Sequence, residues 1–172
     1  MYNRAALEDL FDYTTFTWES YGRSLKQLPP DALTRPIAGS GWSSLWEVLV
    51  HLAVAWDEWL RDRLGLDNAL DVDAASLVSW DDIQAIRERT RGWLKRVLEE
   101  TADEELHGRA ALMFEGTAAE IRATAADILA HMLLHERGHH GDISTLLVQL
   151  GAMAPNVDYI VYLWFKQRRE TG

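Results

Sequence analysis

Cysteine is absent from this chain of 172 residues. That absence excludes disulfides, thiolate metal sites and cysteine nucleophiles. Positive charge is also scarce: 17 Lys and Arg residues stand against 27 Asp and Glu residues, which gives a formal net charge of −10. Because nucleic-acid-binding proteins usually present a basic face, this balance argues against a nucleic-acid partner.

Long hydrophobic runs are missing as well. No stretch reaches the roughly 18 apolar residues that a membrane span needs. Near the N-terminus, Glu8, Asp9 and Asp12 interrupt the apolar residues, so this segment lacks the apolar centre of a signal peptide. We therefore expect a cytoplasmic protein without a membrane partner.

The rest of the composition is that of a globular protein. Apolar residues make up 48% of the chain and charged residues 26%, which is too apolar for a disordered chain. A chain of this length buries roughly 70% of its unfolded surface, enough to form its own core. We expect a single domain over residues 1–172.

Apolar residues recur every three or four positions along most of the chain, the period of an amphipathic helix. The pattern predicts four long helices and a short C-terminal one. Their expected ranges are 3–27, 43 or 44 to 64, 79–100, 124–150 and, for the short helix, 156–168. Serine or threonine precedes three of these helices, with an acidic residue three positions later, as N-caps and capping boxes require. These pairs are Ser44 with Glu47, Ser79 with Asp82, and Thr124 with Asp127.

The segments between the helices differ in character. Residues 29–41 hold three Pro and two Gly, which favours a long ordered loop. Residues 65–78 form a polar connection, and residues 101–123 are compatible with an irregular excursion or a small hairpin. We predict an all-α four-helix bundle with a short extra C-terminal helix. The long connection at 28–43 leaves room for a crossover, so loop lengths leave the topology open.

Four of the six histidines lie within ten residues: His131, His135, His139 and His140. The first three are spaced by four, so on a helix they form one ridge, on or beside the core-facing side. His51 lies within the apolar stripe of the second helix. Facing helices of a bundle can hold a metal through such side chains. The alternative for each histidine is a hydrogen-bonded core residue or a surface position.

Two segments resemble the DinB-like family of damage-inducible proteins. Residues 41–52 (GWSSLWEVLVHL) are similar to its first His motif, and residues 131–143 (HMLLHERGHHGDI) to its His-x3-His-Arg-Gly-Gln signature. The resemblance extends over about the whole chain. It implies that His51, His135 and His139 bind a divalent metal, nickel or zinc in this family. His140 and Asp142 stand where the signature has Arg and Gln.

Three further side chains are candidates to support the metal ligands. His131 lies one turn before His135 on the same ridge. Asp142 follows His139 by three residues and can orient its imidazole, although a solvated helix charge is the alternative. His140 is the third candidate. We interpret His107, in the irregular segment, as solvated or structural.

Three protein ligands leave coordination positions open, which is typical of catalytic sites. Because the family includes bacillithiol and mycothiol S-transferases, the resemblance implies transfer of a small-molecule thiol to an electrophile. A metal-dependent hydrolase and a non-enzymatic, stress-associated metal- or ligand-binding protein are the alternatives, and the residues do not separate them. Family members commonly form homodimers, which we expect here. A set of four tryptophans is expected in the core and dimer surface, with some lining a substrate pocket: Trp42, Trp46, Trp56 and Trp59.

Overall fold

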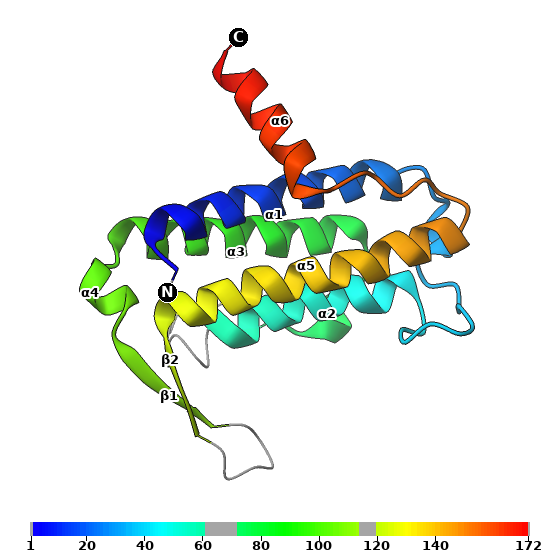
Figure 1. The fold of residues 1–172 in the computed structure, drawn as a ribbon. Coiled ribbons are helices and arrows are strands. Elements are labelled where there is room, and N and C mark those ends of the chain that lie inside the picture. Colours follow the sequence, from blue (N-terminus) through cyan, green and yellow to red (C-terminus); the bar gives the residue numbers. More distant parts are fainter. Residues whose placement is uncertain (1, 61–71, 114–119, 172) are drawn as a thin grey trace. The chain divides into compact units, whose positions relative to one another are not determined.

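The computed structural model describes residues 2–60, 72–113 and 120–171, and its all-α class is the one expected (Figure 1). The four long helices are α1 (Arg4–Leu25), α2 (Leu45–Glu58), α3 (Trp80–Glu100) and α5 (Ala125–Gln149). The shorter elements are η1 (Pro30–Ala32), η3 (Ala74–Ser76), α4 (Asp103–Leu106) and α6 (Tyr159–Glu170). Within the described ranges, no helix has the length and apolar character to cross a membrane. The expected end of the second helix, at residue 64, falls outside the described residues.

The predicted starts of α2, α3 and α5 are confirmed, but α6 begins at Tyr159 and not at residue 156, because the backbone of Asp158 is still extended (φ −62°, ψ 144°). Ser79 Oγ accepts a hydrogen bond from the Asp82 backbone N–H (3.2 Å), and Asp82 accepts one from the Ser79 N–H (2.8 Å). Thr124 and Asp127 exchange the same pair of bonds, both at 3.0 Å. At the start of α2, Ser44 Oγ accepts a hydrogen bond from the Glu47 backbone N–H (3.3 Å), and the Glu47 carboxylate accepts one from the N–H of Ser43 (2.6 Å). These bonds satisfy donors that every helix start leaves unpaired.

The C-terminus of α5 also follows the sequence. Gly151 adopts a positive φ of 86°, which glycine tolerates without strain. Its N–H donates to the carbonyl of Val148 (3.0 Å), and the Ala152 N–H donates to the carbonyl of Leu147 (2.9 Å). This is the Schellman pattern, and it fixes the point at which the helix stops.

A small hairpin occupies part of the segment that the sequence left ambiguous. Strands β1 (Arg109–Met113) and β2 (Glu120–Thr124) pair antiparallel, with Arg109 opposite Thr124 and Met113 opposite Glu120. Residues 114–119, which include the expected Gly116 turn, lie outside the described residues. Since β2 ends at Thr124, the N-cap of α5, the hairpin leads directly into that helix (Figure 1).

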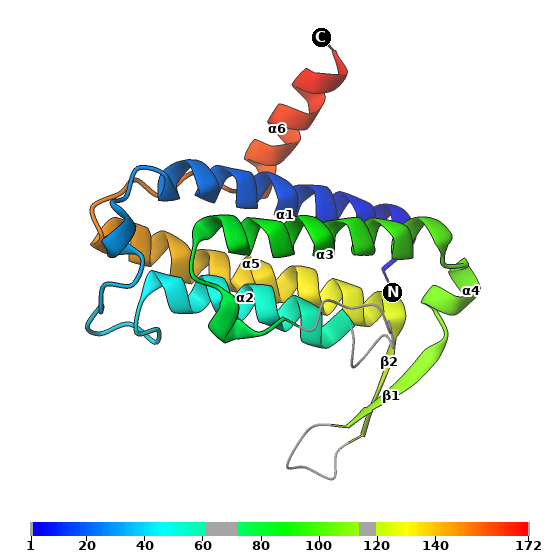
Figure 2. The same cartoon turned by 180° about the vertical axis from the view of Figure 1, so that it is seen from behind.

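The chain divides into two compact units, the first formed by Met1–Glu8 and Leu49–His135. Within it, α2 and the first half of α5 lie side by side (Figures 1 and 2). Its core is aliphatic with one central indole: Leu49, Leu52, Trp56, Ile83, Ile86, Leu94, Leu98, Leu129, Met132 and Leu133. The buried Arg87 guanidinium lies over the ring of Trp56, 5.8 Å from its centroid. The apolar stripes predicted for these helices therefore face one core.

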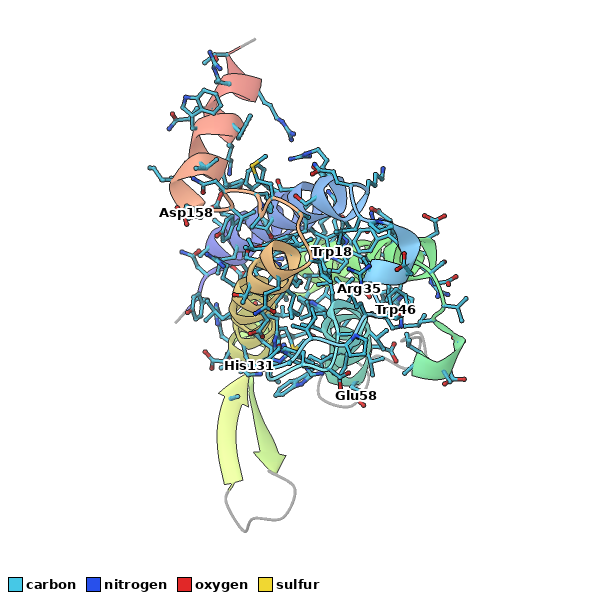
Figure 3. The ribbon with its side chains drawn as sticks, turned by 90° about the vertical axis from the view of Figure 1, so that its right-hand side faces the viewer. Trp18, Arg35, Trp46, Glu58, His131 and Asp158 are labelled. Atoms are coloured by element: carbon cyan, nitrogen blue, oxygen red, sulfur yellow. The ribbon has the colours of Figure 1, made fainter. Side chains whose placement is uncertain are left out.

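The second unit comprises Asp9–Val48 and Glu136–Gly172. In it α6, which begins directly after Asp158 (Figure 3), is held against α1 by Asp9. The Asp9 carboxylate accepts hydrogen bonds from Tyr159, Tyr162 (3.0 Å) and Lys166 (2.6 Å). Burial alone would raise the pKa of Asp9, but these bonds lower it. Lys166 and Asp9 therefore form an ion pair.

Candidate metal centre

The histidine ridge lies along the edge of the buried side of α5. Glu136, His140 and Ile143 are fully buried, His135 and His139 are half-buried, and His131 is exposed. Leu134, although apolar, is 51% exposed. Solvent therefore reaches the helix face that bears the candidate ligands.

His51 approaches this ridge from α2, within the first unit. Its Nε2 atom lies 3.4 Å from Nε2 of His135, and the two ring centroids are 5.3 Å apart. The separation exceeds the roughly 2.9–3.0 Å typical of an N–H hydrogen bond. Two nitrogens bound about 2.0–2.1 Å from one tetrahedral ion lie about 3.3 Å apart, so the observed spacing suits a shared cation.

His139 follows His135 by one turn of α5. His51, His135 and His139 each offer one ring nitrogen, and these atoms lie within 4.8 Å of one another. Neutral imidazole nitrogen is a good ligand for zinc, nickel, iron and copper. The three histidines can therefore bind a metal ion, as the sequence predicted.

Asp142 orients His139. Its Oδ2 atom lies 2.9 Å from Nδ1 of His139 and also accepts a hydrogen bond from Nε1 of Trp42 (3.0 Å). Because an indole N–H only donates, this oxygen acts as an acceptor, and the short contact to His139 requires the proton on Nδ1. The Nε2 lone pair of His139 then remains for a metal, an arrangement found around many metal-binding histidines. The contact between Asp142 Oδ2 and His139 Nδ1 therefore supports the hypothesis that Asp142 orients a metal ligand.

Trp42 is a residue of this centre that helical spacing did not assign to it. We expected it in the core or in a dimer surface, with the wall of a substrate pocket as the alternative. Its half-buried ring instead contacts His139 edge-on, with centroids 5.3 Å apart, in addition to the hydrogen bond to Asp142. Because Trp42 precedes α2, helical periodicity gave no signal for it, although it lies inside the segment that resembles the family's first motif.

His131 has a different environment from the three candidate ligands. Its ring lies against Trp59 of the first unit, with centroids 4.5 Å apart, and stacks on His135 at 6.0 Å. Figure 3 labels it on α5, near the hairpin. Among the described residues, His131 is outside the group of three that can hold a metal.

His140 and Glu136 face α1 of the second unit. Nε2 of His140 lies 3.5 Å from both Glu136 Oε1 and Thr17 Oγ1, and Tyr21 donates a hydrogen bond to the His140 carbonyl (2.8 Å). Burial raises the pKa of Tyr21, so its hydroxyl remains a donor. These contacts place the His140 ring in a buried polar cluster. Glu136, although it carries a carboxylate, is fully buried.

Comparison with known proteins agrees with the fold and the motifs. The sequence model of the DinB family matches residues 1–170. The chain belongs to the DinB family. A crystal structure of a DinB-like protein from Bacillus cereus ATCC 10987 matches with a TM-score of 0.63 and 22% identity, over 84% of this chain and 92% of that chain. At this identity the likeness concerns the fold. None of the curated proteins matches the chain.

Single alanine replacements test the ligand assignment in this DinB-family protein. Replacing His51, His135 or His139 should weaken metal binding more than about 100-fold, because each removes one of three protein ligands. Replacing His131 should weaken it less than about tenfold, since its ring lies against Trp59. Metal content after gel filtration and competition with a chromophoric chelator measure both effects. A stoichiometric metal in His135→Ala would exclude this triad, and a larger loss from His131→Ala would favour a 131/135 pair.

A second set of variants tests the orientation of His139. Asp142→Ala removes the acceptor of the Nδ1 proton and should weaken metal binding about 10- to 100-fold. Trp42→Phe keeps a ring beside His139 but removes the N–H, so the loss should be smaller than about tenfold. Trp46→Phe, a half-buried tryptophan on α2, is the matched control. Unchanged affinity in Asp142→Ala would mean that the carboxylate does not orient the ligand.

Proposed function

We propose that this DinB-family protein is a metal-dependent S-transferase that joins a low-molecular-weight thiol to a small electrophile. The observation that supports the proposal most directly is the approach of His51, His135 and His139 on a helix edge that solvent reaches. Three neutral nitrogen donors leave coordination positions open, as in catalytic sites. Membership of the family supports the thiol chemistry by resemblance.

The residues of the chain have separable tasks in this proposal. His51, His135 and His139 hold the ion, Asp142 keeps the His139 proton on Nδ1, and Trp42 fixes Asp142. When bound, a divalent cation supplies Lewis acidity that favours the deprotonated form of a thiol near neutral pH. The new C–S bond then forms at the electrophilic carbon of the second substrate while its leaving group departs. The resemblance to the family implies nickel or zinc, and both accept nitrogen ligation.

Turnover with a thiol panel tests the proposal. The protein is stripped with a chelator, reloaded with Ni²⁺ or Zn²⁺, and assayed with bacillithiol, mycothiol, glutathione and cysteine against 1-chloro-2,4-dinitrobenzene. We expect release of chloride and a thioether product with at least one thiol, and a loss of more than about 100-fold on metal removal or in His135→Ala.

Parallel assays distinguish the alternatives. An ester and amide panel is run on the same metal-loaded protein. Ester or amide turnover without thiol turnover would favour a hydrolase in which the same triad activates water. Metal binding without turnover in either panel would favour a binding protein. Thiol turnover that persists after metal removal would contradict the proposed role of the triad.

We also propose that two copies associate through α6. Its outer face is strongly exposed, with Ile160 at 71% and Trp164 at 50%, although Asp9 anchors its inner face. The helix has three basic residues and one acidic residue, so it carries +2 and the rest of the chain −12. A helix that is both cationic and apolar is complementary in charge to an acidic surface on a second copy. The exposed residues Asp12 and Glu19 of α1 belong to such an acidic surface. The four tryptophans that the sequence led us to expect in such a surface do not belong to α6 and are buried or half-buried: Trp42, Trp46, Trp56 and Trp59.

Light scattering at micromolar concentration tests this association. The protein should have about twice the 19.6 kDa chain mass, and Trp164→Glu or Ile160→Glu should reduce the mass to that of one chain, because a charge would be buried. Val78→Glu, at a residue that is 82% exposed before α3, is the control and should leave the mass unchanged. A single-chain mass for the unmodified protein would contradict the proposal.

A further inference from the structure

We propose that Trp59, His131 and Leu134 form a binding surface for a neutral aromatic electrophile beside the metal ligands. The inference rests on the proposed function and specifies the class of its second substrate. All three residues belong to the first unit, as do His51 and His135.

The first support is a continuous series of rings. The Trp59 indole lies 4.5 Å from the His131 ring at a 40° tilt, His131 stacks on His135 at 6.0 Å and 30°, and His135 lies 5.3 Å from His51. One end of the series therefore consists of two candidate metal ligands and the other of an indole. A single ring, that of His131, therefore separates the Trp59 indole from the candidate ligand His135.

The second support is exposure. Trp59 is half-buried, His131 is exposed and Leu134 is 51% exposed. Leu134 and His135 follow His131 by three and four positions, so each is a neighbour of His131 on the surface of α5. Single exposed apolar residues are ordinary on a protein surface. Here the exposed Leu134 follows His131 by less than one helical turn, and the His131 ring lies against the Trp59 indole. We infer that these three side chains form one apolar surface.

The chemistry of this surface selects the ligand. Indole and imidazole rings favour stacked or edge-on contacts with another ring, and the Leu134 side chain adds apolar contact. Because an indole ring is electron-rich and the side chains of Trp59 and Leu134 carry no charge, we infer a neutral, electron-poor aromatic ring.

Binding is measured without catalysis. The non-reactive probe 1,3-dinitrobenzene is added to metal-loaded protein whose tryptophans carry ¹⁵N, and the indole N–H signals are followed by NMR. The indole N–H signal of Trp59 is assigned as the one missing from the spectrum of Trp59→Leu. We expect this signal to shift when the probe is added to the unmodified protein. Trp93→Leu, at a half-buried tryptophan of α3 in the same unit, identifies a signal that should stay in place. Movement of the Trp42 signal alone, or of none, would overturn the proposal.

Variants connect binding to turnover. Trp59→Leu should raise the Kd of the probe and the KM for 1-chloro-2,4-dinitrobenzene about five- to tenfold. The thiol KM, kcat and metal content should stay within about twofold. Leu134→Glu, at an exposed residue, should have a similar effect without a change in the core, and Val148→Glu on α5 is its control. An unchanged Kd in both variants would overturn the surface.

The outcomes for this surface and for the proposed function are distinguishable. Probe binding at Trp59 without turnover of any thiol would support the surface and contradict the S-transferase. Thiol turnover with an unchanged KM in Trp59→Leu and Leu134→Glu would support the S-transferase and contradict the surface.

Discussion

The unbroken course of α5 is the constraint on which the candidate metal centre depends. His135, His139 and Asp142 are separated by four and three residues, so their relative positions follow from the pitch of one helix. The Thr124–Asp127 box defines where this helix starts, and Gly151 defines where it stops. Two interior glycines, Gly138 and Gly141, each reduce helix stability by about 1 kcal/mol relative to alanine. The helix must therefore be stabilised by what it packs against.

The buried side of α5 is unusual because it is partly polar. Glu136 and His140 are fully buried beside Thr17 and Tyr21 of the second unit. Nε2 of His140 lies 3.5 Å from both Glu136 Oε1 and Thr17 Oγ1, while its Nδ1 atom has no hydrogen-bond partner among the described residues. Burying such groups without partners would destabilise the fold by several kcal/mol. A polar cluster of this kind also restricts how α1 and the second half of α5 can pack, because a shift would leave those groups without their partners.

The departure from the family signature at Asp142 has a chemical consequence. A glutamine at this position would offer both a donor and an acceptor, whereas a carboxylate offers only acceptors. The two N–H groups that meet Asp142, from Trp42 and His139, match that property. The replacement therefore restricts His139 to one tautomer, the one with a free Nε2. Trp42 lies in the segment before α2, whereas His139 lies on α5. The edge-on contact between their rings therefore joins residues that are 97 positions apart in the sequence.

The sequence by itself determined the helices, their caps and the identity of the histidines. Periodicity and capping are local properties, so Ser79 with Asp82 and Thr124 with Asp127 could be recognised from spacing alone. The His51 and His135–His139 motifs identified the family and the candidate ligands. The hairpin at residues 109–124 remained one of two alternatives, because a short apolar run does not distinguish a strand from an irregular segment.

Only the tertiary structure decided which side of each helix the polar residues occupy and which distant residues meet them. Leu134 is exposed and Glu136 is buried, although hydrophobicity alone suggests the reverse. The contacts of Trp42 with Asp142, of Trp59 with His131 and of Lys166 with Asp9 each join residues far apart in the chain. The physical reason is that the free energy of burying a polar or aromatic group depends on the partners that packing provides, and helical spacing contains no record of those partners.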